Sequence, residues 1–311
     1  MSSNEPGMSG SIGDLITLGA VQFGLDYGIT NRSGVPSDEE LRSILQTALA
    51  GRVTRLDTAR SYGNSEERLG KLLPALGEGA WRITTKIPQL GGMRDVEDSP
   101  GFADSAVANL DRSLAALQRD SVDLLLLHAS EDMWRSGVIE RLEKERDRGR
   151  FREFGVSVYD PDEAAECLKD SRVEHLQIPL SLLDHRWFGA PFEPAIARRS
   201  DVTIHVRSAF LQGLLLHGPE FWPVWVRHAN EIDAILMDAS RRLEGGRIEL
   251  CLRFLTSLPW VGRVIVGVHS SLQLREILAI RNLDPLPAEL RKKVDRAAGL
   301  APERLLIPSR W

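Results

Sequence analysis

Short apolar runs alternate with longer amphipathic segments along almost the whole chain. Eight of these runs have the length and composition of buried β-strands, at 15–21, 53–57, 82–86, 122–127, 153–157, 175–178, 202–206 and 263–267. The segments between them carry apolar residues at spacings of three and four, which predicts helices over 37–49, 65–76, 105–117, 138–148 and 161–169. Strands that alternate with helices in this way build a parallel sheet.

Eight such units without a Pro/Gly/Ser-rich linker favour one closed domain over two doubly wound ones. We therefore predict an α/β fold, a single-domain (β/α)8 TIM barrel over residues 14–311. Residues 1–13 are expected to form a disordered leader, and a helical insertion is expected at about 217–245. The tail, 285–311, is expected to add one helix. Capping boxes are predicted where Ser37 precedes Glu40 and where Ser270 precedes Gln273.

Composition and charge narrow the class of protein. The chain has 311 residues, of which 42% are hydrophobic and 27% charged, which is typical of a soluble globular protein. A net charge of -5 without a long basic stripe gives no support for a nucleic-acid partner. No signal-peptide pattern and no long apolar run are present, so we expect a cytoplasmic protein without a membrane partner. Cys167 and Cys251 stand far apart without ligand spacing, which disfavours a disulfide framework or a metal site.

Four polar residues follow predicted strands, where a barrel of this kind places its reacting groups. They are Asp57, Tyr62, Lys86 and His128. Each one alone is more often a solvated strand end, a packing residue or a capped core residue. Together they suggest an acid catalyst, because a phenol with a pKa of about 10 is a poor acid near neutral pH unless a cation stabilises the phenolate. Lys86 would be that cation, Asp57 its counter-ion, and His128 a hydrogen-bond donor to a substrate carbonyl, provided that all four meet at one mouth.

The segments that carry these residues resemble the aldo-keto reductase family. LDTARSYGNSEERLGKLL, ITTKI and DLLLLH are similar to the family's segments for its Asp, Tyr, Lys and His tetrad, and the similarity continues through GVSVYDPDEA, LQIPLSLLD, VRSAFLQGLLL and VIVGVHSSLQL. The resemblance implies reversible hydride transfer between NADPH, or NADH as the alternative, and an aldehyde or ketone. It also implies that Tyr62 is the general acid and base. The opening LGAVQFGLDYGI is similar to a bacterial subgroup often assigned to sugar pathways.

The resemblance also assigns residues to the coenzyme, position by position. They are Ser157, Gln177, Arg207, Ser208, Leu211, Gly213, Ser271 and Gln273. Val158 stands where the family has an asparagine for the carboxamide, and Arg207 stands where an aromatic ring commonly stacks on the nicotinamide. Gln273 occupies a position that is often cationic in NADPH-selective members, so the cation for the phosphate would have to come from elsewhere, with Arg275 as a candidate, or be absent. A plain helix cap is an equally good interpretation of Ser270 and Gln273.

Loops that are expected at the same end of the barrel carry residues that could line a substrate-binding site. Tyr27, Trp134 and Trp187 are the aromatic candidates, and Asp26, Asp184, His185 and Arg186 are the polar ones. Aromatic walls with several polar groups favour a sugar or another small carbonyl compound. Two alternatives stay open: a catalytically slow regulatory subunit that binds nicotinamide nucleotide, and an aldolase-like barrel in which Lys86 forms a Schiff base. An adjacent carboxylate counter-ion disfavours the Schiff base.

Overall fold

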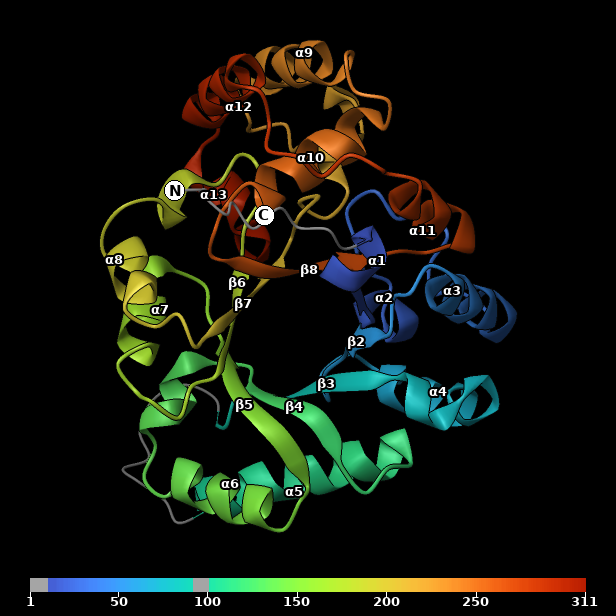
Figure 1. The fold of residues 1–311 in the computed structure, drawn as a ribbon, viewed down its shortest axis with the longest axis vertical. Helices are drawn as coiled ribbons and strands as arrows, with labels where there is room; N and C mark the ends of the chain where they lie inside the picture. Colours follow the sequence, from blue (N-terminus) through green and yellow to red (C-terminus); the bar gives the residue numbers. More distant parts are fainter. Residues whose placement is uncertain (1–10, 92–100) are drawn as a thin grey trace, which may run out of the picture.

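Eight parallel strands close into a barrel in sequence order, and β8 pairs with β1 (Figure 1). This computed structural model describes residues 11–91 and 101–311. The strands are β1 Ile16–Gly19, β2 Arg55–Asp57, β3 Arg82–Ile87, β4 Val122–Leu127, β5 Phe151–Ser157, β6 His175–Pro179, β7 Thr203–Arg207 and β8 Val261–Gly267. All eight predicted strands are present, and the predicted (β/α)8 architecture is confirmed. Their inner and outer faces are mostly buried, as parallel strands covered by helices require.

Helices alternate with these strands and surround the barrel. They are α1 Ile12–Leu15, α2 Val21–Gly24, α3 Asp38–Ala50, α4 Ser65–Leu72, α5 Gly101–Leu117, α6 Val138–Asp147, α7 Pro161–Cys167, α8 Phe192–Ala197, α9 Ala229–Ser240, α10 Gly246–Thr256, α11 Ser271–Leu278, α12 Ala288–Leu300 and α13 Glu303–Leu306. The five predicted helices are all present. α4 ends earlier than predicted because Pro74 starts a separate 3₁₀ turn. None of the helices in the described ranges combines the length and the apolar character needed to cross a bilayer.

The predicted leader is too long at its C-terminal end. Residues 1–10 lie outside the described residues, but Ser11 begins an ordered segment by donating from its backbone N–H to Asp14 Oδ2 at 3.0 Å. Ile12 and Leu15 of α1 are buried, and α1 packs against β1 and β8. Because these two side chains contribute to the core beneath the barrel, residues 11–13 belong to the folded domain.

The insertion and the tail pack on each other. α9 falls within the predicted insertion, and α12 from the tail lies beside it at one edge of the molecule (Figure 1). The tail contains α13 in addition to the single helix that was predicted, and Trp311 Nε1 donates to the backbone oxygen of Leu305 at 3.0 Å. This contact fixes the end of the chain against α13.

The two predicted capping boxes are each half correct. Ser37 Oγ accepts from the backbone N–H of Glu40 at 3.1 Å, but the Glu40 carboxylate accepts from the backbone N–H of Ser271 at 2.6 Å instead of returning to its own cap. Ser270 Oγ accepts from the N–H of Gln273 at 3.2 Å, and Gln273 Oε1 accepts from the N–H of His269 at 2.8 Å. The start of α11 is therefore held by its own loop and by α3.

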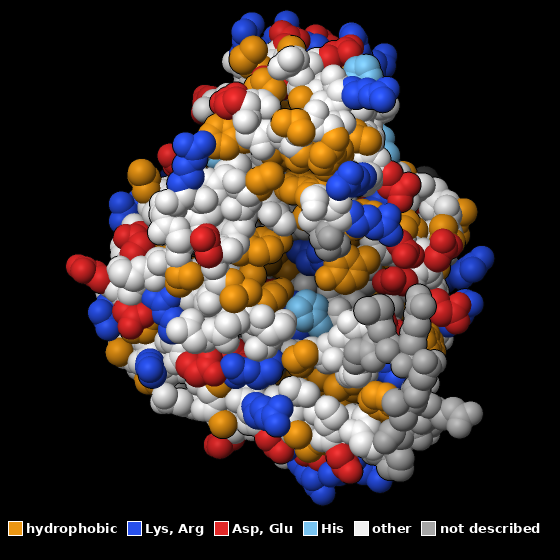
Figure 2. All heavy atoms as spheres, turned by 180° about the vertical axis from the view of Figure 1, so that it is seen from behind, with side chains coloured by type: hydrophobic (Ala, Val, Ile, Leu, Met, Phe, Trp, Pro, Cys, Tyr) orange, Lys and Arg blue, Asp and Glu red, His pale blue; other side chains and the backbone are white. Residues whose placement is uncertain are grey.

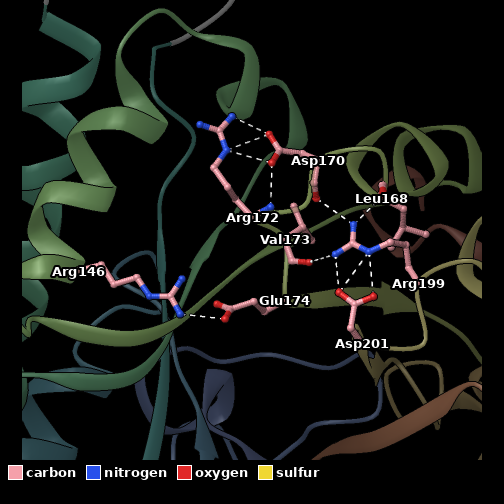
Figure 3. A network of polar contacts seen from close by, with 8 residues as sticks. All are labelled: Arg146, Leu168, Asp170, Arg172, Val173, Glu174, Arg199 and Asp201. Carbon is pink, nitrogen blue, oxygen red and sulfur yellow. Dashed lines mark hydrogen bonds and ion pairs between the residues drawn. The ribbon is translucent and has the colours of Figure 1, made fainter.

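An arginine between α8 and β7 fixes the loop between α7 and β6 (Figure 3). The Arg199 guanidinium donates to the backbone oxygens of Leu168 at 2.8 Å, Asp170 at 2.9 Å and Val173 at 2.8 Å, and it pairs with Asp201. Only 16% of the Arg199 side chain is exposed. One side chain thus satisfies three carbonyls that precede β6.

We expect Arg199→Ala to lower the free energy of unfolding by about 2–4 kcal/mol, because three partly buried carbonyls lose a charged donor. Urea unfolding followed by far-UV circular dichroism measures this change. The matched control is Arg198→Ala, which removes an exposed neighbouring arginine. Equal losses in the two variants would contradict the role of Arg199.

Candidate active site

Four side chains from β2, β3 and β4 and their loops meet at the C-terminal end of the barrel. Asp57 ends β2, Lys86 is near the end of β3, His128 directly follows β4, and Tyr62 lies in the loop between β2 and α4. Lys86 Nζ donates to Asp57 Oδ1 at 2.5 Å, to the backbone oxygen of Thr58 at 3.0 Å and to Tyr62 Oη at 3.3 Å. The Tyr62 and His128 rings lie edge to face, with centroids 5.8 Å apart. The four residues therefore lie together at one end of the barrel, which is the condition that the proposed acid catalyst must meet.

Lys86 is a fully buried cation held by a carboxylate. Burial pulls the pKa of Lys86 down, but attraction to Asp57 and Tyr62 outweighs burial, so that its pKa lies above the ordinary value. The second Asp57 oxygen accepts from Gln177 Nε2 at 2.7 Å, so both carboxylate oxygens are engaged. The ammonium thus stays charged beside the phenol oxygen of Tyr62. A charged and paired lysine is a poor Schiff-base nucleophile, which weighs against the aldolase alternative.

His128 is a neutral imidazole at the same mouth. Burial lowers the pKa of His128 to about 3, with further contributions from the positive charges of Lys86 and Arg207. Its Nδ1 lies 3.2 Å from Ser61 Oγ, and the roles of the two atoms depend on the tautomer. A neutral ring keeps one N–H. If Ser61 donates to Nδ1, the Nε2–H is available to a bound substrate.

The low pKa of His128 predicts a loss of stability in acid. The unfolded chain binds a proton at this residue near pH 6.5, whereas the folded protein binds it only near pH 3, so acid favours unfolding between these values. We expect this group to contribute a slope of about 1.4 kcal/mol per pH unit within that window and none above it. Urea unfolding of the wild type and of His128→Asn at several pH values measures the slope. An identical slope in both proteins would refute the assignment.

A cavity of about 780 Å³ opens at this end of the barrel, within the range of about 300–1,000 Å³ typical of ligand sites. Figure 2 shows the face opposite to that of Figure 1, on which hydrophobic side chains gather around a central hollow. Of the residues that the sequence singled out, those lining the cavity are Tyr27, Asp57, Tyr62, His128, Gln177, Arg207, Ser208, Gly213 and Gln273. The structure thus brings the tetrad region and most of the predicted coenzyme residues to one concavity.

Ser157 and Gln177 lie side by side at the ends of β5 and β6. Ser157 Oγ is buried and has no hydrogen-bond partner among the described residues. Gln177 Nε2 is committed to Asp57, which leaves only its amide oxygen for a ligand. An unsatisfied buried hydroxyl next to a free amide oxygen is a donor and acceptor pair that suits a carboxamide.

The loop after β7 has an unusual backbone. Ser208, Leu211 and Gln212 have positive φ values of 65°, 48° and 55°, and Gly213 follows at 88°. Non-glycine residues in this region cost energy and tend to cluster at ligand sites. A Cβ on Gly213 would lie 2.2 Å from Thr30 Oγ1, so the loop after β1 packs directly on this glycine. The Leu211 side chain is buried, so only its backbone remains for the predicted coenzyme contact.

Arg207 is fixed to the wall of the cavity. Its Nη2 donates to the backbone oxygen of Val158 at 3.1 Å, and its guanidinium lies 4.4 Å from the centre of the Tyr159 ring. The guanidinium is thus held beside the mouth, where the resemblance expected an aromatic ring. Tyr159 was missed from the sequence, although its position two residues after β5 is the kind of place where such a residue is expected.

At the end of the cavity next to α11, the lining residues differ from those that were predicted. Ser271 does not line the cavity, since its side chain is buried and its N–H is taken by Glu40, so its coenzyme contact stays a prediction. Arg275 lines a separate cavity between α3 and α11. The residues at this end that the sequence analysis missed are His269 and Glu276, both of which line the cavity.

Two of the three predicted substrate aromatics lie outside the cavity. Trp187 is fully buried and packs edge-on against Phe192, with ring centroids 5.2 Å apart, so its side chain does not reach the cavity in this structure. Trp134 is 53% exposed but is not among the lining residues. Arg186 pairs with the buried Asp184 at 2.7 Å, which gives both a structural partner. Gln22, which the sequence analysis did not single out, lines the cavity with an Oε1 atom that lacks a partner in the described chain.

The barrel, the buried Lys86 and Asp57 beside Tyr62, and the large cavity next to them form a site at which a proton can be given to a bound substrate. The family that the chain matches makes this the site of an NAD(P)-dependent oxidoreductase. The model of the Aldo/keto reductase family matches residues 15–298, and the chain belongs to this family.

Individual relatives agree with this assignment. The chain is 26% identical over 268 residues to the uncharacterized oxidoreductase YqkF of Bacillus subtilis (strain 168), a match that covers 79% of this chain and 84% of that protein. It is 34% identical over 139 residues to an aldo-keto reductase of Mycobacterium avium (strain 104), which covers 43% of this chain and 45% of that protein. The holo form of the aldo-keto reductase AKR11C1 from Bacillus halodurans superposes with a TM-score of 0.70 at 23% identity, covering 92% of each chain. This structural likeness shows the shared fold.

Proposed function

We propose that this protein reduces the carbonyl group of a sugar or another small aldehyde with NADPH, and that Tyr62 is the general acid. One observation carries the proposal: Lys86 Nζ lies within hydrogen-bonding distance of both Asp57 and the phenol oxygen of Tyr62. When bound, the coenzyme supplies the hydride. Tyr62 would donate its proton to the carbonyl oxygen and, in the oxidative direction, would take the proton of the alcohol.

The other three residues of the tetrad support that proton transfer. Lys86 would stabilise the negative charge left on the phenol oxygen, and Asp57 holds Lys86 in position. His128 would donate its remaining N–H to the same substrate oxygen. Donors fixed in advance around an oxygen that gains negative charge lower the barrier more than they stabilise the neutral substrate.

The residues around the cavity fit a nicotinamide coenzyme. The buried, unpartnered Ser157 Oγ and the free Gln177 oxygen would hold the carboxamide. The strained loop at Ser208 and Gly213 would follow the pyrophosphate, and Arg207 would lie against the nicotinamide ring. The N-terminus of α11 contributes less, because Glu40 and Ser270 already accept from the backbone N–H groups of Ser271 and Gln273.

The sugar assignment rests on the rim of the cavity. Tyr27 is 36% exposed and Tyr159 is 42% exposed, and Tyr27 lines the cavity together with Arg207 and His128. Aromatic faces next to polar groups suit a molecule that has both apolar faces and hydroxyl groups. A small polyhydroxylated aldehyde meets these requirements better than a large apolar ketone.

We expect NADPH to be preferred over NADH by less than about 30-fold in kcat/KM, which corresponds to about 2 kcal/mol. Among the described residues that line the cavity, none from α11 or the turn before it is Lys or Arg, since Arg275 faces another cavity, and Glu276 adds a carboxylate at this end. Initial rates at matched concentrations of the two coenzymes give the ratio. A preference for NADPH far above this range would show that a strong cation binds the 2′-phosphate.

The test of the function is a substrate panel. Oxidation of NADPH and of NADH is followed by absorbance against aldoses, deoxysugars and simple aldehydes, and turnover is expected to be highest with a sugar or small aldehyde. Quenching of tryptophan fluorescence during coenzyme titration is the binding control. Coenzyme binding without turnover on any aldehyde would overturn the proposal and favour a regulatory subunit.

A further inference from the structure

The end of the barrel opposite the mouth carries a second cluster of polar side chains on the inner wall. Residues at every second position of a barrel strand face the interior. Arg55 and Arg82 lie two and four residues before the mouth residues of their own strands, and His175 and His205 each lie two residues before theirs. All four therefore belong to the inward-facing set, at its N-terminal end.

These side chains line a cavity of about 80 Å³. Thr17 of β1 lines the same cavity, and it is only 2% exposed. Its Oγ1 is buried without a hydrogen-bond partner in the described part of the chain. A water molecule occupies about 30 Å³ of the liquid, so the cavity has room for a small polyatomic ion.

The arginines of this cluster carry more positive charge than the acidic side chains paired with them carry negative charge. Within residues 11–91 and 101–311, neither Arg55 nor Arg82 forms an ion pair or a side-chain hydrogen bond, and Arg263 donates to the backbone oxygen of Asp14. Burial lowers the pKa of Arg55, and repulsion from Arg263 and Arg82 lowers it further. The pKa of Arg263 is likewise lowered by burial and then by Arg82. Three guanidinium groups thus repel one another here.

The acidic residues nearby have other partners. Glu153 lies 3.2 Å from His175 Nε2, and Asp123 accepts from the backbone N–H of Ile83 at 2.8 Å. Asp123 also lies 3.9 Å from Arg152, which is largely exposed. Both carboxylates line the cavity, and neither approaches Arg55 or Arg82 within 4.0 Å. The cavity is therefore lined by three arginines, Arg55, Arg82 and Arg152, and by these two carboxylates, which leaves one positive charge in excess.

We propose that this cavity binds a small oxyanion, such as inorganic phosphate or sulfate, with Arg55 and Arg82 as its charged ligands and the Thr17 hydroxyl as a further donor. Such an ion would neutralise the repelling guanidinium groups and join β1, β2 and β3. Residues at this face of a TIM barrel serve stability, so the bound ion stabilises the barrel without taking part in the chemistry at the mouth.

The experiment is a thermal unfolding titration of the full chain at constant ionic strength. Phosphate or sulfate replaces chloride, and the unfolding midpoint is expected to rise with the logarithm of the anion concentration above the dissociation constant, by about 2–4 °C at about ten times that constant. Because phosphate also suits the coenzyme end of the mouth, each titration is repeated with saturating NADPH. A glycerol 3-phosphate arm distinguishes a free ion from the phosphate of a larger molecule, which is expected not to fit.

Amino-acid substitutions test whether the ion binds in this cavity. Arg82→Gln and the nearly isosteric Thr17→Val are expected to abolish or weaken the rise of the midpoint with anion concentration, whereas Arg198→Gln, which removes an exposed arginine elsewhere, keeps it. In chloride alone, Arg82→Gln is expected to unfold at no lower a temperature than wild type, because one of three like charges is gone. A rise of the same size in wild type and in Arg82→Gln, or a rise that NADPH removes, would overturn the proposal.

Discussion

Tyr62→Phe is expected to lower kcat for carbonyl reduction by about 10³-fold or more and to leave the coenzyme dissociation constant within about twofold of wild type. The substitution removes only the phenol oxygen that Lys86 Nζ contacts at 3.3 Å, and it keeps the ring that lies edge-on to His128. Because the lost group acts on the reacting oxygen, kcat and kcat/KM should fall together. Steady-state kinetics and fluorescence titration with NADPH measure the two quantities separately.

Tyr159→Phe is the matched control for this variant. Tyr159 is exposed near the mouth and stacks beneath Arg207, but its hydroxyl has no place in the proposed proton transfer. We expect its turnover to stay within about threefold of wild type, which is the scale of a minor change in substrate contact. Substantial turnover in Tyr62→Phe, or an equal loss in both variants, would refute the role given to Tyr62.

The fold could be predicted from the sequence because each strand has a recognisable local pattern of apolar residues. Runs such as 122–127 are short, apolar and flanked by amphipathic segments, so their type and their alternation with helices can be read from the local pattern. The convergence of Asp57, Lys86 and His128 followed from the same pattern. In a parallel barrel all C-terminal strand ends point to one face, so residues at those positions must meet.

The side chains that the sequence misplaced depend on packing between distant segments. Trp187 has the same local character as an exposed loop tryptophan, but in the structure it is buried and packs against Phe192. Ser271 looks like a free residue at the start of a helix until Glu40, far away in the chain, takes its N–H. The arginine cluster at the other end is visible only once the strand register places Arg55 and Arg82 on the inner wall.

Breaking the buried pair of Lys86 and Asp57 is expected to be the most destabilising single change in the site. Lys86→Met would leave the Asp57 carboxylate buried, with Gln177 Nε2 as its remaining side-chain donor. An unpaired buried charge costs about 3–5 kcal/mol, so the free energy of unfolding should fall by that amount. Urea unfolding measures the loss, and turnover should fall with it because no cation remains beside Tyr62.

The double variant Lys86→Met/Asp57→Asn separates these two effects. With both charges removed, no buried group is left unpaired as an ion, and most of the lost stability should return because the net worth of a buried pair is small. Turnover should stay as low as in Lys86→Met, since the phenolate of Tyr62 would still lack its ammonium. Recovery of turnover together with stability would mean that Lys86 has only a structural role at this end of the barrel. Continued instability in the double variant would mean that the ammonium and carboxylate hold β2 and β3 together through their shape and hydrogen bonds.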